Sequence, residues 1–195
     1  MRAQQLPFAL ILFRLAAGPL LLVLSLVRPP LTPVLCTVLL ALGVLSDIFD
    51  GMIARRLDCV TPVLRLWDSR CDVVFWLSVA ISVHLLYPTI WATTWIMLAV
   101  LGAMEVTTHL ISYVRFRREA STHHVLSKIF CLFLWALVSQ IYLTGATGWL
   151  FWLTLVVGVA SQLEAMAIML VVPSWHVDVK NLAVALALRR NSDER

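Results

Sequence analysis

Charge is scarce in this sequence. Asp, Glu, Lys and Arg together make up 13% of the 195 residues, whereas hydrophobic residues make up 61%. A soluble domain needs a polar surface, so this scarcity and a mean hydropathy of +0.91 exclude a soluble fold. Ser- and Gly-rich linkers are also lacking between the apolar segments. The sequence therefore predicts an integral membrane protein with a single domain, residues 1–195.

Cysteine is infrequent as well, and its spacing excludes two kinds of site. The four cysteines form no C-x-x-C pair and have no histidine at metal-ligand spacing, so neither a zinc site nor a disulfide framework is expected. The net charge of +4 comes from basic residues at the ends of apolar segments. The distribution of Lys and Arg in membrane proteins explains that placement, and nucleic acid is not an expected partner.

Six apolar segments are long enough to cross a bilayer. Only short polar breaks separate them, which predicts antiparallel neighbours and an all-α bundle of about six transmembrane helices. The expected spans are residues 7–27, 31–56, 64–86, 89–113, 125–144 and 149–172, followed by a tail, residues 173–195. In that tail Trp175, Val179, Leu182 and Leu186 recur at helical spacing, so it is either a helix on the membrane surface or a frayed end.

The basic residues predict the orientation of the spans. They gather after the second span, after the fourth span and in the tail, whereas the opposite side has only Arg28. Because Lys and Arg are retained on the cytoplasmic side, both termini are expected there, in a multi-pass protein of the inner (cytoplasmic) membrane.

Four aspartates border the second and third apolar segments. Asp47 and Asp50 are spaced i,i+3, and Asp68 and Asp72 are spaced i,i+4, so each pair lies on one face of a helix. Charge at membrane depth is costly unless it is paired, hydrated or bound to metal, which makes this cluster a candidate functional site. The alternative is that the four side chains cap helix ends and pair with nearby arginines, Arg55, Arg56, Arg65 and Arg70.

Carboxylates without cysteine or histidine favour a hard divalent cation such as Mg²⁺ or Mn²⁺. Four of them carry more charge than one such ion neutralises, so two ions are expected. Paired metal ions are typical of phosphoryl chemistry, and Arg55 is placed to meet a phosphate oxygen.

These residues resemble the signature of the CDP-alcohol phosphatidyltransferase family. The signature reads Asp, two residues, Asp-Gly, two residues, Ala-Arg, eight residues, Gly, three residues, Asp, three residues, Asp. Matching positions are Asp47, Asp50, Gly51, Ala54, Arg55, Asp68 and Asp72. One position departs, because Leu64 stands where the second glycine is expected, which puts the pose or affinity of the nucleotide in question.

The resemblance implies a reaction and roles for the matching residues. Family members displace CMP from a CDP-linked lipid, usually CDP-diacylglycerol, with an alcohol hydroxyl. By resemblance, Asp47, Asp50 and Asp68 are metal ligands, and Asp72 is a ligand or the base that accepts the hydroxyl proton. Gly51, Ala54 and Arg55 lie against the CDP moiety. The resemblance also implies a homodimer.

Cations and hydrogen-bond donors follow the fourth span. If the acceptor alcohol carries a phosphate, the expected clamp is Arg117, Arg118, His124 and Lys128. An ordinary basic loop is the equal alternative. The acceptor is a small alcohol, phosphorylated or not.

The other spans contain Arg14, Glu105 and Glu164. Arg14 either contacts a ligand or snorkels towards the membrane surface, and we favour snorkelling. Glu105 stands four residues before His109, so the two are placed to pair. Glu105 and Glu164 either line a water-filled cavity or are held protonated between helices.

Two other functions fit an aspartate cluster in a membrane. A divalent-cation transporter would place carboxylates in two pseudo-symmetric halves, but the Asp pattern has no repeat in the second half. A catalytically inert relative would have lost a metal ligand, whereas all four Asp are present and only Leu64 departs.

Overall fold

The computed structural model describes residues 5–59, 61–118, 120, 124–176 and 179–193. These residues form helices and no strand, as expected for an all-α membrane protein. Six helices are long and apolar enough to cross a membrane, and they agree with the predicted spans within three residues. They are α1 (Leu6–Val27), α2 (Thr32–Arg56), α3 (Pro62–Leu86), α4 (Trp91–Phe116), α5 (Val125–Thr144) and α6 (Gly148–Val171). The short helix η2 (Pro88–Ile90) precedes α4, and α7 (Leu182–Asp193) follows α6.

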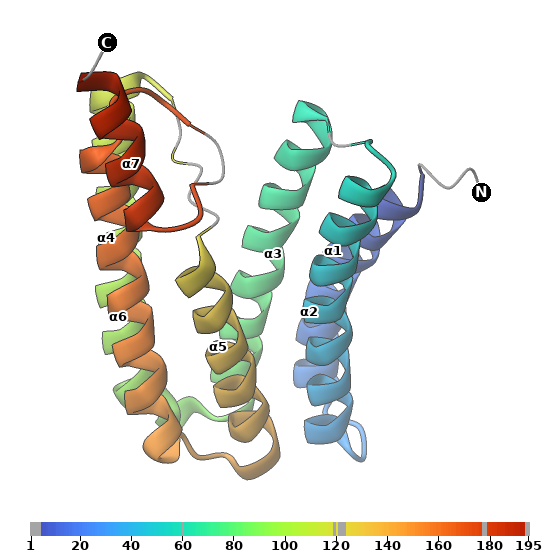
Figure 1. Ribbon diagram of the computed structural model, residues 1–195. Helices are drawn as coiled ribbons and strands as arrows, with labels where there is room; N and C mark the ends of the chain where they lie inside the picture. Colours follow the sequence, from blue (N-terminus) through green and yellow to red (C-terminus); the bar gives the residue numbers. More distant parts are fainter. Residues whose placement is uncertain (1–4, 60, 119, 121–123, 177–178, 194–195) are drawn as a thin grey trace. The chain divides into compact units, whose positions relative to one another are not determined.

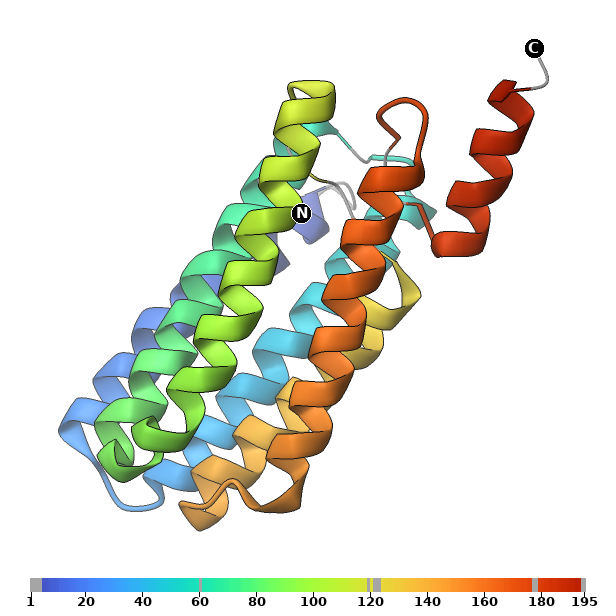
Figure 2. The same ribbon diagram turned by 90° about the vertical axis from the view of Figure 1, so that its left-hand side faces the viewer.

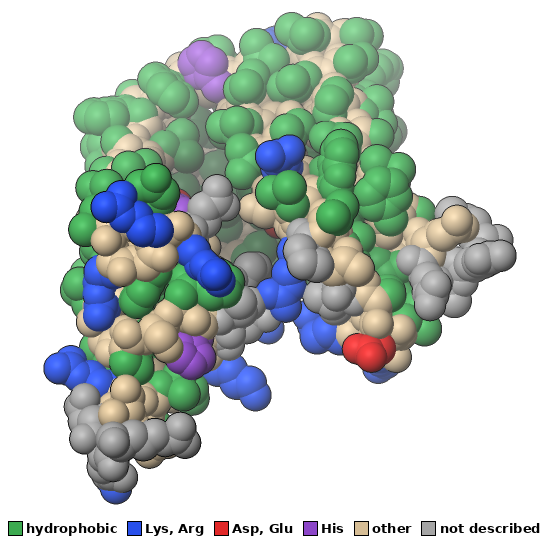
Figure 3. Space-filling model, turned by 90° about the horizontal axis from the view of Figure 1, so that it is seen from above, with side chains coloured by type: hydrophobic (Ala, Val, Ile, Leu, Met, Phe, Trp, Pro, Cys, Tyr) green, Lys and Arg blue, Asp and Glu red, His purple; other side chains and the backbone are tan. Residues whose placement is uncertain are grey.

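Contacts divide the chain into two compact units. The first comprises Met1–Trp91 and Val138–Ala146, and the second comprises Ala92–Leu137 and Thr147–Arg195. Seen from above, the ends of the helices carry Lys and Arg side chains, whereas hydrophobic side chains cover much of the remaining surface (Figure 3). That distribution suits helices whose flanks face lipid and whose ends face water.

In the first unit, α1 packs against both α2 and α3 (Figure 1). Two glycines permit this close approach. A Cβ atom on Gly43 of α2 would lie 2.3 Å from Cζ of Phe75 on α3, and one on Gly18 of α1 would lie 2.9 Å from Oγ of Ser78. Phe75 is buried at this crossing. Gly18 therefore lets α1 approach the backbone of α3 closely, and Gly43 leaves room on α2 for the ring of Phe75.

The connection between α2 and α3 is closed by two helix caps. At the end of α2, the amide of Cys59 donates to the carbonyl of Ala54 (3.0 Å), and Asp58 adopts a left-handed conformation with φ 47°. This arrangement is a Schellman motif. Thr61 then caps α3, because its hydroxyl oxygen accepts a hydrogen bond from the backbone amide of Leu64, with an N–O distance of 3.1 Å. These caps fix where each helix ends, and thus the height of the aspartates on both helices.

The last residues of α5 belong to the first unit. The hydroxyl of buried Tyr142 is hydrogen bonded to Ser82 on α3, and the hydroxyl of Tyr87 donates to the carbonyl of Tyr142 at 2.7 Å. These bonds satisfy polar groups that would otherwise face hydrocarbon, and they hold the C-terminal end of α3 in place.

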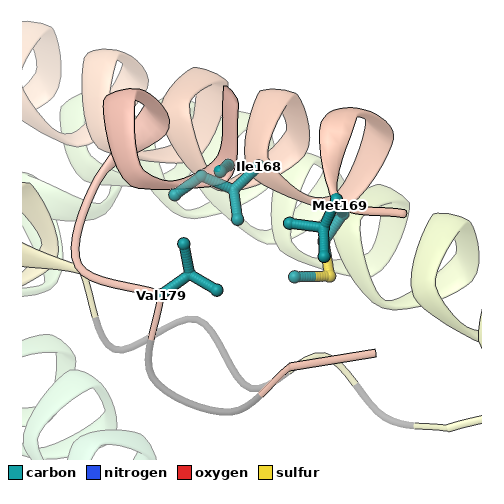
Figure 4. Packing of buried hydrophobic residues seen from close by; sticks show 5 residues of the cluster. Ile168, Met169 and Val179 are labelled. Atoms are coloured by element: carbon teal, nitrogen blue, oxygen red, sulfur yellow. The ribbon is translucent and has the colours of Figure 1, made fainter. Parts of the chain in front are cut away.

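In the second unit, the chain turns back after α6 and α7 lies beside it (Figure 2). A buried apolar cluster, Ile168, Met169, Val172, Val179 and Ala185, joins them. Figure 4 shows Val179 pointing towards Ile168. The tail therefore contains a helix, as one of the two expectations held, but that helix begins only at Leu182. Val179, expected on a membrane-facing surface, is instead buried against α6.

Candidate functional site

The four aspartates lie at matching depth in the first unit. Each stands six to ten residues from the nearest end of α2 or α3, as does Arg14 from the start of α1. At 1.5 Å per residue, this places all five side chains about 9–15 Å from the helix ends. Because α2 and α3 are joined by a short connection and both pack against α1, equal depth brings these side chains together.

Arg14 occupies the centre of the cluster and is only 1% exposed. Its Nη1 atom contacts Asp47 of α2 and lies 2.8 Å from Asp72 of α3. Its Nη2 atom lies 3.0 Å from Asp50 of α2 and contacts Asp68 of α3. Each terminal nitrogen therefore links one carboxylate of α2 to one of α3. The expectation that Arg14 snorkels to the surface is wrong, because its charge is compensated inside the bundle.

Three of the four carboxylates lie close enough together to hold a metal ion. Asp47, Asp50 and Asp68 each offer an oxygen, and these oxygens lie within 4.8 Å of one another. Asp50 is buried, whereas the other two are partly accessible. Asp72 joins them through the shared Nη1 of Arg14. An all-oxygen, anionic donor set fits Mg²⁺ or Mn²⁺, and the guanidinium shows that a cation is accommodated at this point.

Three further residues of the motif lie on the last turns of α2. Ala54 is buried, and Arg55 is exposed. A Cβ atom on Gly51 would lie 3.3 Å from Nη1 of Arg55, so the guanidinium lies over the glycine. The absence of a side chain at Gly51 thus leaves the surface beside Asp50 open to the guanidinium of Arg55. Contact of these three residues with the CDP moiety stays a prediction.

Leu64, the departure from the motif, lies in the first turn of α3. Its φ is not positive, and its amide takes part in the Thr61 cap. The backbone conformation therefore does not demand glycine at this position. Any effect of leucine here must come from the volume of its half-buried side chain.

The predicted acceptor clamp falls in the second unit. Arg117 and Arg118 are exposed after α4, with their guanidinium groups 5.9 Å and 4.9 Å from the ring centroids of Tyr113 and Trp175. Lys128 is exposed in the first turn of α5. The binding of an acceptor phosphate by these residues stays a prediction.

His124 differs from the other clamp candidates because it is 2% exposed. Its Nε2 atom lies 3.1 Å from both the carbonyl and the hydroxyl oxygen of Ser161 on α6, and 3.9 Å from Oε2 of Glu164. The imidazole thus holds the start of α5 against α6. The sequence did not predict this contact, because Ser161 and Glu164 lie on α6 and the whole of α5 separates them from His124 in the sequence.

The two intramembrane glutamates have distinct partners. Glu105 lies 3.2 Å from Nε2 of His109, as the spacing predicted, and it also accepts a hydrogen bond from Gln162 at 2.7 Å. Glu164 accepts the amide of Leu182, the first residue of α7, at 3.2 Å. An acidic side chain at a helix N-terminus is favourable, so Glu164 anchors α7 to α6.

Arg14 is the site residue that sequence reasoning assigned incorrectly. One feature of the sequence could have predicted the correct position of Arg14. Arg14 and the four aspartates stand at similar distances from the ends of their segments, and hence at similar depth. That signal gains meaning only when the first span is known to pack beside the second and third, which the sequence does not state.

Comparison with known proteins agrees with the arrangement of the site. A model of the CDP-alcohol phosphatidyltransferase family matches residues 4–160, a range that includes the four aspartates and Arg55 of the motif together with Arg14. No curated protein and no solved structure matches the chain. The chain belongs to the CDP-alcohol phosphatidyltransferase family. The family implies a membrane transferase of phospholipid biosynthesis that moves a phosphatidyl group from a CDP-alcohol to an acceptor, and it is metal-dependent in general.

Proposed function

We propose that this protein transfers the phosphatidyl group of CDP-diacylglycerol to a small alcohol and releases CMP. The observation that carries the proposal is the convergence of four carboxylates from α2 and α3 around one buried point. The matched motif and the family match support a CDP-linked donor. We place the reaction at the cytoplasmic surface of the inner membrane, in a homodimer.

In the proposed reaction, the alcohol oxygen forms a bond to the phosphorus that carries diacylglycerol. The bond from that phosphorus to the bridging pyrophosphate oxygen breaks, and CMP leaves with this oxygen. The hydroxyl proton passes to a carboxylate, and the place of Asp72 in the family motif makes it the candidate for this role.

Asp47, Asp50 and Asp68, with Asp72 as a further ligand, would hold two Mg²⁺ or Mn²⁺ ions. When bound, such ions screen phosphate charge and stabilise the leaving oxygen. Gly51, Ala54 and Arg55 would lie against the CDP moiety, with Arg55 meeting a phosphate oxygen.

The acceptor is proposed to be a small alcohol, phosphorylated or not, and the basic residues after α4 suit a phosphorylated one. Arg117, Arg118 and Lys128 offer exposed donors for its phosphate. His124 completes the clamp by holding the start of α5, which carries Lys128, against α6.

The test is CMP release from CDP-diacylglycerol by purified protein with Mn²⁺ and a panel of phosphorylated and unphosphorylated alcohols. We expect release with at least one alcohol and a loss of about 100-fold or more in Asp68→Asn and Asp72→Asn, because a neutral amide cannot replace an anionic ligand or a base.

Asp58→Asn is the matched control, since Asp58 lies in the α2–α3 connection outside the cluster and asparagine tolerates its left-handed conformation. Full activity in both cluster variants would overturn the mechanism. Mn²⁺ uptake by vesicles that depends on Asp47, without CMP release, would favour a transporter.

A further inference from the structure

The aspartate cluster has a charge imbalance. Four carboxylates from two helices surround one guanidinium, and Asp50 and Arg14 are both almost fully buried. Unpaired charge of one sign at membrane depth is costly, so the cluster needs cations to stay assembled. In the structure, the cation among the four carboxylates comes from α1 of the same chain.

The position of Arg14 coincides with the predicted metal ligands. Its two terminal nitrogens contact an oxygen from every one of the four aspartates. A divalent ion bound by the same carboxylates would repel a guanidinium held between them. Arg14 and metal ions therefore compete for the same carboxylate oxygens.

The guanidinium is not fully satisfied where it lies. Its Nε atom is buried and has no hydrogen-bond partner within the described part of the chain. A buried donor without a partner is unfavourable. The contacts of the Arg14 guanidinium with the carboxylates are therefore made by Nη1 and Nη2, and the unpartnered Nε favours its exchange for a stronger cation.

We propose that Arg14 is a built-in counter-cation that competes with divalent metal for the aspartate cluster. It holds the carboxylates of α2 and α3 together when metal is absent, and it releases these carboxylates when metal binds. This inference rests on the metal-binding part of the proposed function. Removal of Arg14 should therefore tighten metal binding. Removal of a residue that positions the metal ligands would weaken it.

The test measures Mn²⁺ binding to purified, metal-free, full-length protein in detergent, by calorimetry, without any CDP-lipid. We expect Arg14→Gln to bind Mn²⁺ at least about tenfold more tightly than the wild type, because the competing charge is removed. Without metal, this variant should melt at a lower temperature than the wild type, and Mn²⁺ should raise its melting temperature by more. Arg28→Gln is the matched control, since Arg28 follows the last residue of α1 and its side chain donates hydrogen bonds to the backbone carbonyls of Ser25 and Leu85.

If Arg14→Gln fails to fold, Arg14→Lys decides the question. Lysine keeps the charge but has one nitrogen in place of the two that bridge the helices. We therefore expect the Mn²⁺ affinity of Arg14→Lys to lie between that of the wild type and that of Arg14→Gln. Unchanged or weaker Mn²⁺ binding in the folded variants would overturn the role of Arg14 while leaving the proposed function intact. If neither wild type nor variant binds Mn²⁺, the metal part of the proposed function fails as well.

Discussion

At the scale of single residues, Leu64 is where this chain differs from its family motif. Its backbone is helical and capped, so replacement by glycine tests the volume of the side chain. We expect Leu64→Gly to lower KM for CDP-diacylglycerol with kcat little changed, if leucine narrows the nucleotide pocket. Steady-state kinetics of CMP release measure this.

Glycine also weakens a helix by about 1 kcal/mol, so the control is Leu66→Gly, two residues further along α3, where the side chain is exposed. Equal KM values in wild type and Leu64→Gly would show that this side chain does not limit the nucleotide site.

Arg117 tests the acceptor class at the same scale. Its guanidinium is exposed beside the ring of Tyr113 and is proposed to meet the acceptor phosphate. We expect Arg117→Ala to raise KM for phosphorylated alcohols about tenfold and to leave unphosphorylated ones unaffected, since a charge-assisted bond is lost. The same assay on Arg189→Ala, an exposed arginine of α7, is the control. An equal loss for both classes of alcohol would contradict a phosphate contact.

At the scale of helices, the ring of Phe75 on α3 packs against Gly43 of α2 and so links the two helices that carry the aspartates. Even one methyl group on Gly43 would meet the buried ring of Phe75. We expect Gly43→Ala to destabilise the protein by about 1–3 kcal/mol and to weaken Mn²⁺ binding, because the helices that carry the four aspartates are forced apart. Thermal unfolding and calorimetry measure the two effects.

The same substitution at Gly102 of α4 is the control for this prediction. A Cβ atom there would meet nothing within 4 Å, so Gly102→Ala should be neutral or slightly stabilising, since alanine favours helix. A Gly43→Ala protein as stable as the wild type would show that α2 and α3 can separate without cost.

At the scale of the whole molecule, the orientation in the membrane is a prediction from charge. Six spans return the chain to the side where it starts, and Lys and Arg gather after α2, after α4 and in the tail. We expect a C-terminal green fluorescent protein fusion to fluoresce in bacteria and a C-terminal alkaline phosphatase fusion to be inactive, because both termini are predicted to be cytoplasmic. Fusions made after Tyr87, in the α3–α4 connection, should show the reverse pattern. Exchange of the two patterns would place the aspartate cluster on the opposite side.

The sequence by itself determined the helical spans and the aspartate motif. Both depend on spacing within one segment: about twenty apolar residues suffice to cross a bilayer, and i,i+3 or i,i+4 carboxylates share a helix face whatever surrounds them. The pairing of Glu105 with His109 follows from the same local rule.

Only the tertiary structure decided which cation meets the aspartates and what holds the tail. Arg14 reaches Asp47 and Asp72 because α1 packs against both helices at one depth, and Val179 is buried because the chain turns back along α6. These contacts join residues far apart in sequence, and no local period encodes them. Helix packing thus turned an arginine expected at the membrane surface into the centre of the site.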